Sequence, residues 1–169
     1  MRCLKSKEMQ CELRGVRDED AAVLFEQWAD PVAAHMAAFT GPDHMDRTAF
    51  ERRLARLSAD ETVINNVIVV DGEVVGTIGS WGEPGDREVT YWIGRSFWGR
   101  GIATAALKAF LTVDPTRPLR ARVASDNVAS RRVLEKCGFQ VIAYERGFAG
   151  ARGCEIEEVV LRLAGSSSA

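Results

Sequence analysis

A glycine-rich connection at residues 98–104 constrains this chain of 169 residues more than any other feature. It reads WGRGIAT, and it lies between the strand-like run Arg87–Ile93 and an apolar helical run that begins near Ala103. A turn with two glycines exposes backbone N–H groups, and the helix that follows adds the positive end of its dipole. Such a turn readily binds a phosphate or pyrophosphate group. The sequence therefore predicts an α/β domain that holds a phosphorylated ligand.

The spacing of apolar residues predicts strands and helices on both sides of this connection. Strands are expected at Cys11–Val16, Thr62–Val70, Glu73–Trp81, Arg87–Ile93, Leu119–Ala124, Phe139–Phe148 and Cys154–Leu163. Helices are expected from a cap at Asp18 to Trp28, from Asp30 and Pro31 through Phe39, at Arg47–Leu57, from Ala103 to the prolines at 115 and 118, and from Asp126 or Asn127 to Cys137.

Turn signals connect these elements into one domain. Asp71-Gly72 predicts a tight hairpin, and Gly138 suits the position just after a helix end. No repeat or linker divides the chain, so a single domain is expected over residues 1–163, followed by a disordered tail at 164–169. The order of the elements predicts a mixed α/β fold whose first half is mainly antiparallel.

Composition narrows the classes of protein. Lys and Arg number 22 and Asp and Glu 24, which gives no basic footprint for nucleic acid. No apolar run reaches the roughly 18 residues that a membrane span needs, and no apolar signal segment is visible near the start. The cysteines form no C-x-x-C pair, and His35 and His44 lie nine residues apart, which is not metal-ligand spacing. The sequence predicts a reduced, cytoplasmic protein without a metal.

Two kinds of ligand compete for the glycine connection. A G-x-G turn between strand and helix also opens dinucleotide-binding domains, and Asp126 would then bind the ribose. However, Thr104 stands where the third glycine would be, and only about 70 residues remain for the rest of such a sheet. A plain glycine-rich connection without a ligand is the third interpretation.

Two segments together resemble the GNAT superfamily of acyl-CoA-dependent N-acetyltransferases. Residues 87–107, REVTYWIGRSFWGRGIATAAL, resemble its central strand and pyrophosphate loop, and residues 126–139, DNVASRRVLEKCGF, resemble the N-x-x-S…E-K-x-G-F segment after the next strand. The spacing is similar to that of the ribosomal-protein N-terminal acetyltransferase branch. The resemblance covers about residues 62–163. It implies a mainly antiparallel central sheet flanked by helices, with two splayed central strands that hold acyl-CoA.

The resemblance implies acetyl-CoA as the acyl donor. Backbone N–H groups of Gly99–Thr104 would bind the pyrophosphate, and the edge of Tyr91–Gly94 would pair with the pantetheine amides. Asn127 and Ser130 would lie near the thiol, and a main-chain N–H near Trp92 or Ile93 would polarise the thioester carbonyl. The expected cofactor-binding residues are Tyr91, Trp92, Ile93, Gly94, Trp98, Gly99, Arg100, Gly101, Ile102, Ala103, Thr104, Asn127 and Ser130.

The sequence departs from the family pattern at two positions. Trp98 stands where the loop motif has Gln or Arg, and Leu134 stands where many relatives place a tyrosine that protonates the leaving thiolate. Ser130, with water, is expected to supply that proton instead. Glu88 is expected to act as the general base through water, or else to be a solvated charge at the strand end. Weaker candidates for the base are Glu83, Glu145 and Glu155.

The expected function is transfer of an acetyl group to a primary amine by direct attack in a ternary complex. The amine belongs to a protein N-terminus or to a small molecule; Trp28, Phe39 and Met45 would wall its site or belong to the core. Arg131 and Arg132 would reach CoA phosphates or remain solvated. The alternative is a non-catalytic acyl-CoA-binding or regulatory domain, which the leucine at 134 favours. No nucleic-acid or membrane partner is expected, and a homodimer is possible by resemblance.

Overall fold

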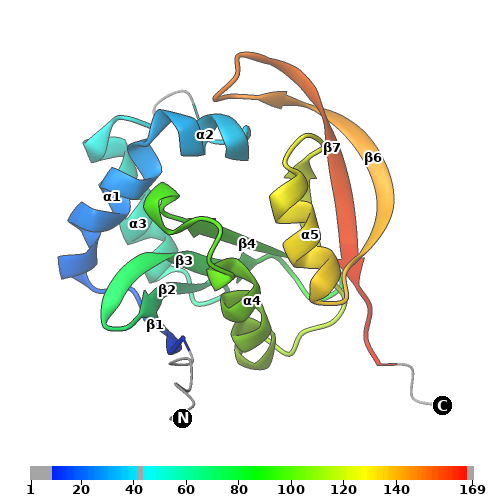
Figure 1. Ribbon diagram of the computed structural model, residues 1–169, viewed down its shortest axis with the longest axis horizontal. Coiled ribbons are helices and arrows are strands. Elements are labelled where there is room, and N and C mark those ends of the chain that lie inside the picture. The colour runs from blue at the N-terminus through cyan, green and yellow to red at the C-terminus, as the bar shows by residue number, and fades with distance from the viewer. Residues whose placement is uncertain (1–8, 42–43, 167–169) are drawn as a thin grey trace, which may run out of the picture.

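The computed structural model describes residues 9–41 and 44–166, and its strands form one seven-stranded sheet in the order β1-β2-β3-β4-β5-β7-β6 (Figure 1). The strands are β1 (Cys11–Gly15), β2 (Ile64–Val70), β3 (Glu73–Trp81), β4 (Arg87–Ile93), β5 (Leu119–Ala124), β6 (Gln140–Ala149) and β7 (Cys154–Leu163). The helices are α1 (Ala21–Ala29), α2 (Pro31–Ala37), α3 (Arg47–Ala59), α4 (Ile102–Val113) and α5 (Val128–Lys136), with short 3-10 turns η1 (Asp18–Asp20) and η2 (Arg95–Phe97).

The sheet is mixed, as the sequence predicts. β4 and β5 run parallel, and every other pair of neighbouring strands is antiparallel. The parallel pair requires a crossover connection, which α4 provides. This topology confirms the expected fold class and places the glycine connection inside the crossover.

Helices cover both faces of the sheet. α4 and α5 pack on one face through a core that includes Ile102, Phe110 and Leu134. α1 and α3 pack on the other face, where Leu24 and Phe50 meet Val67 and Val69 of β2. Successive strand residues point to opposite faces, so a strand such as β4 contributes to both layers.

A buried ion pair fixes the first residue of β4 to the end of α4. Arg87 donates from Nε to Asp114 at 2.6 Å, and Ser80 donates to the same carboxylate oxygen at 2.5 Å. Another nitrogen of Arg87 donates to the carbonyls of Thr62 and Gly82. Because these groups are buried and satisfied, they hold the end of the crossover helix beside the start of β4.

Most predicted elements are present with shifted ends. The Asp71-Gly72 hairpin is confirmed, with φ values of 49° and 85°. The cap predicted at Asp18 is wrong, because Asp18 begins a 3-10 turn and Asp20 stands at the N-cap position of α1, where its side chain makes no capping bond. α2 ends before Phe39 because Ala38 adopts a φ of 68°. Asn127 caps α5 as predicted, with its side chain accepting from Ser130 N.

The two ends of the chain lie partly outside the described residues. The predicted domain includes residues 1–8 and the predicted tail includes residues 167–169, and both of these ranges lie outside the described residues. Residues 164–166 of the tail are described and have no regular structure. Within the described ranges, no helix has the length and apolar character needed to cross a membrane.

Candidate active site

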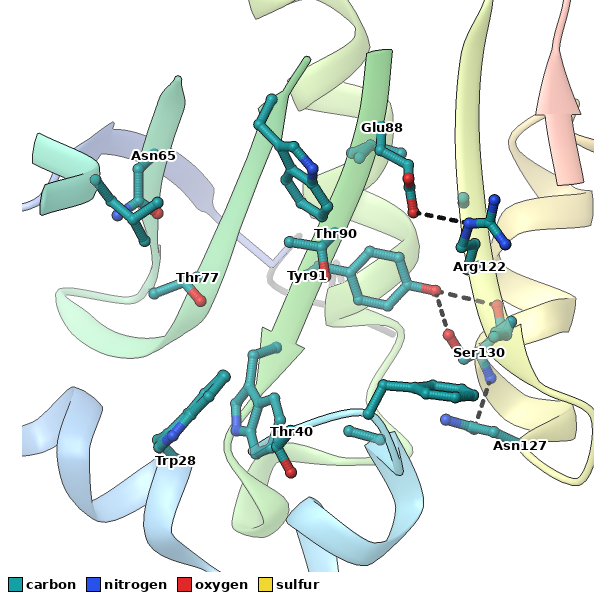
Figure 2. A pocket seen from close by; sticks show the side chains of 18 of the residues that line it. Trp28, Thr40, Asn65, Thr77, Glu88, Thr90, Tyr91, Arg122, Asn127 and Ser130 are labelled. Atoms are coloured by element: carbon teal, nitrogen blue, oxygen red, sulfur yellow. Dashed lines mark hydrogen bonds and ion pairs between the residues drawn. The ribbon is translucent and has the colours of Figure 1, made fainter. Parts of the chain in front are cut away.

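The two central strands separate beside the glycine connection. β4 and β5 pair only at Arg87 with Leu119 and Glu88 with Arg120. Beyond Glu88 the two strands diverge, and Figure 2 shows Tyr91 pointing from β4 across this gap toward α5. The gap leaves backbone groups on one edge of β4 without a strand partner, which suits an extended ligand.

Two cavities meet at this gap. The first, called the loop groove, has a volume of about 620 Å³ and lies between the glycine connection and the start of α5. The second, called the sheet cavity, has a volume of about 500 Å³ and lies between β4, β5 and the α1–α3 layer. The residues lining both are Ala37, Tyr91, Trp92, Asn127 and Ser130.

The glycine connection forms the floor of the loop groove. Gly99 and Gly101 both have a φ of 75°, a conformation that side chains with a Cβ rarely adopt. Gly101 is the N-cap of α4 and no side chain caps the helix, so the N–H groups of Ile102–Thr104 have no acceptor within the helix. These N–H groups and the helix dipole fit a pyrophosphate.

Trp98 anchors the glycine connection by a hydrogen bond to the end of β4. Its indole nitrogen donates to the carbonyl of Ile93 at 2.8 Å, and its ring lines the loop groove. The tryptophan therefore holds the loop against the end of β4. A loop anchored in this way does not depend on Gln or Arg at the same position.

The charged residues of the loop groove are mainly basic. Arg100, Arg132 and Lys136 line it, whereas Arg131 pairs with Glu135 at 2.9 Å. Asp126 forms a bidentate ion pair with Arg152, with N–O distances of 2.7 and 3.0 Å. The dinucleotide interpretation requires Asp126 to bind a ribose. Its ion pair with Arg152 and the mainly antiparallel sheet both argue against that interpretation. The basic lining fits a ligand with several phosphates.

Tyr91 and Ser130 stand where the cavities join (Figure 2). The Tyr91 hydroxyl donates to the carbonyl of Ser130 at 3.0 Å and lies 2.8 Å from Ser130 Oγ. Burial raises the pKa of Tyr91 to about 12, against a smaller lowering by the bond to Ser130. Tyr91 is thus protonated at neutral pH and remains a hydrogen-bond donor. Leu134, one turn further along α5, is 1% exposed.

Glu88 lies at the edge of the sheet cavity in a cluster of charges. Arg122 Nε is 3.5 Å from the Glu88 carboxylate, and another Arg122 nitrogen contacts Glu145 at 2.5 Å and Glu158 at 2.9 Å. Partial burial raises the pKa of Glu88; Arg122 opposes this, and the nearby Glu158 adds to it. A carboxylate with a raised pKa and a side chain 24% exposed can accept a proton from a bound ligand.

Sequence reasoning placed some residues of the sheet cavity and missed others. Trp28 and Phe39 line it, but Met45 does not and is 65% exposed. Of the alternative bases, Glu83 and Glu155 do not line it, and Glu145 contacts it only through Arg122. The polar lining residues on strands that were missed are Asn65, Thr77, Thr90, Arg122 and Glu158. The period-two alternation in the predicted strands could have placed these side chains on one face.

A groove for a phosphorylated ligand that opens beside a carboxylate and two hydroxyls into a second cavity is typical of an acyltransferase with two substrates. The chain belongs to the GNAT acetyltransferase family, since the family model described as Acetyltransferase (GNAT) domain matches residues 10–140. This family carries out N-acetylation from acetyl-CoA, so the expected enzyme class, an N-acetyltransferase, is confirmed.

Individual relatives agree with this assignment. The uncharacterized N-acetyltransferase p20 of Bacillus licheniformis is 29% identical over 162 residues, covering 89% of this chain and 90% of p20. Mycobacterium smegmatis RimJ, solved with a CoA-disulfide, has a TM-score of 0.77 at 23% identity, covering 94% of this chain and 83% of RimJ. Spermidine N-acetyltransferase from Vibrio cholerae, solved with CoA and spermine, has a TM-score of 0.81 at 16% identity, covering 93% and 96%. At 23% and 16% identity, the two solved structures show a shared fold.

Proposed function

We propose that this protein transfers an acetyl group from acetyl-CoA to a primary amine while both substrates are bound. The observation that carries this proposal is the junction of the loop groove and the sheet cavity at Tyr91 and Ser130. Acetyl-CoA supplies the acyl group as a reactive thioester. A donor in one cavity and an amine in the other would meet there without an acyl-enzyme.

The loop groove is the proposed binding site for acetyl-CoA. The N–H groups of Gly99–Thr104 would hold the pyrophosphate, and the unpaired edge of Tyr91–Gly94 would bond the pantetheine amides. A main-chain N–H near Trp92 or Ile93 is the proposed donor that polarises the thioester carbonyl. Asn127 caps α5 and donates to Met36 O at 3.4 Å, so its proposed part is to position Ser130.

Glu88 is the proposed general base. An alkylammonium with a pKa of about 10.4 is roughly 0.1% free base at neutral pH, so removing its proton is a large part of the reaction. The raised pKa of Glu88 brings it closer to that of the amine, and its position at the edge of the sheet cavity lets it act directly or through water. Arg122 would hold the carboxylate in orientation.

Replacing Glu88 with glutamine is expected to lower kcat/KM by about 10²–10⁴-fold at pH values below the pKa of the acceptor amine. In the native protein kcat/KM should rise with pH as Glu88 loses its proton, at a pH above the ordinary glutamate range because its pKa is raised. Steady-state kinetics between pH 5 and 10 measure both effects. Glu83→Gln, a carboxylate outside both cavities, is the matched control. If the pH profile of kcat/KM is the same in Glu88→Gln as in the native protein, Glu88 is not the general base.

Tyr91 and Ser130 are proposed to stabilise the leaving thiolate. A thiol has a pKa of about 8.5, so full proton transfer from a tyrosine with a pKa of about 12 would be unfavourable by roughly 5 kcal/mol. Tyr91 therefore acts by hydrogen bonding, directly or through Ser130 Oγ, and keeps its proton. These hydroxyls would take the place of the tyrosine that is absent at Leu134, so a leucine at that position is compatible with catalysis.

Replacing Tyr91 with phenylalanine is expected to lower kcat about 10–100-fold, the value of a hydrogen bond to a charged group, and to leave the KM for acetyl-CoA nearly unchanged. Stopped assays of thiol release provide both constants. The other tyrosine of the chain, Tyr144, is 57% exposed on β6, so Tyr144→Phe is the control. If Tyr91→Phe retains full kcat, Ser130 or water acts alone.

Two measurements test the proposed function as a whole. Acetyl-CoA should raise the melting temperature of the protein, because a ligand that binds only the folded state stabilises it. Acetyl-CoA together with a panel of primary amines should release free thiol. Stabilisation by acetyl-CoA without thiol release from any amine would favour a binding module over an enzyme.

A further inference from the structure

We propose that the acceptor is an alkylamine that carries a second ammonium group a few bonds from the amine that is acetylated. This inference rests on the proposed N-acetyltransferase function and specifies the substrate of the sheet cavity. The reacting amine would lie beside Glu88. The second ammonium group would bind at a site formed by Phe39, Glu145, Gly147 and Glu158, called the ammonium site.

Three carboxylates share one guanidinium at the acidic end of the sheet cavity. Arg122 lies 3.5 Å from the carboxylate of Glu88, and it contacts Glu145 at 2.5 Å and Glu158 at 2.9 Å. When all three carboxylates are ionised, the cluster has a surplus of two negative charges. Glu158 is buried, so solvent and salt screen this surplus only in part. Two ammonium groups on one ligand would neutralise it.

The basic residues around the acidic end do not remove the surplus. Arg120 pairs with Asp86 and adds no net charge. Arg53 also lines the sheet cavity, but its guanidinium lies 4.8 Å from the Trp28 ring. Figure 2 shows Trp28 across the cavity from Glu88. The acidic end is therefore the part of the cavity that attracts cations.

Two of the three carboxylates stand directly opposite each other in the sheet. Glu145 of β6 pairs with Glu158 of β7, and like charges at opposed positions destabilise a strand pair. The next pair, Arg146 and Glu157, has opposite charges and points to the other face of the sheet. A like-charge pair kept on the cavity face alone indicates a cationic ligand rather than a contribution to stability.

Gly147 leaves an open space between an aromatic ring and a carboxylate. It lies inside β6 and is not among the glycines with a positive φ, so its backbone conformation does not require glycine. A Cβ built at Gly147 would lie 3.4 Å from the ring of Phe39 and 3.7 Å from a carboxylate oxygen of Glu158. A glycine inside a strand often marks the close approach of a ligand. An ammonium group in this space would contact both the charge of Glu158 and the face or edge of the half-exposed ring.

Two buried polar atoms of the cavity lining lack a hydrogen-bond donor. Thr40 is 7% exposed, and its Oγ1 has no partner among residues 9–41 and 44–166. Within the same ranges the side-chain oxygen of Gln27 has none, and its amide nitrogen donates to Val74 O. Leaving such groups unsatisfied is costly. A ligand with several N–H groups can supply the missing donors, which an apolar ligand cannot do.

The two nitrogens would have different parts in the reaction. The amine beside Glu88 would pass its proton to that carboxylate and form the new C–N bond, while the thioester C–S bond breaks and the thiolate leaves with the electron pair. The second ammonium group keeps its proton and holds the substrate in place. Because Glu88 and Glu158 contact the same guanidinium, a short alkyl chain would connect the two nitrogens.

The test compares matched amines with the purified full chain and acetyl-CoA. Cadaverine and pentylamine have the same alkyl chain and differ in the second amine, and a tetrapeptide with a free alanine N-terminus represents protein substrates. Thiol release is expected with cadaverine at a kcat/KM at least tenfold above those of pentylamine and the peptide, which exceeds the statistical advantage of two equivalent amines. The ratio should shrink as salt is added, because salt screens exposed charges.

A charge variant tests the acidic surplus. Glu145→Gln removes one of the two surplus charges and should lower the cadaverine-to-pentylamine ratio of kcat/KM at least fivefold. Glu155→Gln is the matched control, since Glu155 lies on β7 but points to the face opposite Glu158 and lines neither cavity. It should leave the ratio unchanged.

A volume variant tests the position of the ammonium site. Gly147→Val fills the space beside Phe39 and should raise the KM for cadaverine at least tenfold. The Kd for acetyl-CoA should stay within twofold, which also shows that the variant is folded. Gly15→Val, at a strand glycine of β1 whose Cβ would meet no atom within 4 Å, should change neither constant.

The outcomes distinguish this inference from the function on which it rests. Turnover of pentylamine or of the peptide as fast as that of cadaverine would overturn the inference and leave the acetyltransferase intact. Binding of acetyl-CoA without thiol release from any amine would overturn the proposed function and the inference together. A preference for cadaverine that is lost in Glu145→Gln and Gly147→Val and kept in the two controls supports the inference.

Discussion

Replacing Gly101 with valine is expected to raise the Kd for acetyl-CoA at least a hundredfold. Gly101 has a φ of 75°, which strains a β-branched residue, and it is the N-cap whose helix directs N–H groups into the loop groove. A Cβ built at this position meets no protein atom within 4 Å. The expected loss therefore comes from backbone strain and from the volume that the side chain occupies on the ligand side, rather than from a clash within the loop. Calorimetric titration measures the Kd.

Gly85 provides a matched control for Gly101→Val. It has a φ of 96° in the turn between β3 and β4, and a Cβ there also meets no atom within 4 Å. Gly85→Val thus carries similar backbone strain away from both cavities. Both variants should melt at a lower temperature, but only Gly101→Val should lose the stabilisation by acetyl-CoA. Equal acetyl-CoA affinity in the two variants would argue against the pyrophosphate placement.

Replacing Asp114 with alanine is expected to destabilise the protein by about 3–5 kcal/mol. Its carboxylate accepts from Arg87, Ser80 and the N–H of Thr116, and Asp114 is 1% exposed. Removal leaves the charge of Arg87 buried and uncompensated. The melting temperature should fall by roughly 6–20 °C. Asp86→Ala breaks the exposed ion pair with Arg120 and should cost at most about 1 kcal/mol.

The same carboxylate should make stability depend on pH. Burial alone would raise the pKa of Asp114, but the bonds from Arg87, Ser80 and Thr116 lower it to about 2. A depressed pKa in the folded state stabilises the protein at pH values above the unfolded pKa near 3.9. This contribution, about 2.5 kcal/mol, is lost as the pH falls from 4 to 2. Urea denaturation at pH 2 to 6 should show this slope in the native protein and a smaller one in Asp114→Ala.

The strands and the family could be predicted because they depend on local pattern. β3, β4, β5 and β7 begin and end where the alternation of apolar residues predicts. The start of α1 could not be placed, because Asp18 and Asp20 are both plausible caps in sequence. Asp20 stands at the N-cap position, but its carboxylate accepts from Arg14 of β1 at 2.8 Å and from the Arg17 N–H instead of capping the helix, and the bond from Arg14 exists only in the folded chain.

The loop groove, the proposed cofactor site, is easier to predict from sequence than the sheet cavity, the proposed acceptor site. The loop groove consists largely of two continuous segments, residues 91–104 and 126–136, so a motif can represent it. The sheet cavity draws on α1, α2, α3 and five strands, with Arg53, Asn65, Thr77 and Glu158 far apart in the chain. No short motif can record such a set, because its members are brought together by long-range packing.

The sequence by itself determined the fold class and the kind of donor, because glycines that need positive φ and a helix that follows them are local requirements. Only the tertiary structure brought together the two hydroxyl groups that we propose in place of the tyrosine missing at Leu134. Tyr91 reaches Ser130 from a strand 39 residues away because β4 and β5 diverge and leave room for its ring. The charge sharing of Glu88, Glu145 and Glu158 around Arg122 is likewise a product of the tertiary structure, because the four side chains come from four different strands, β4, β6, β7 and β5.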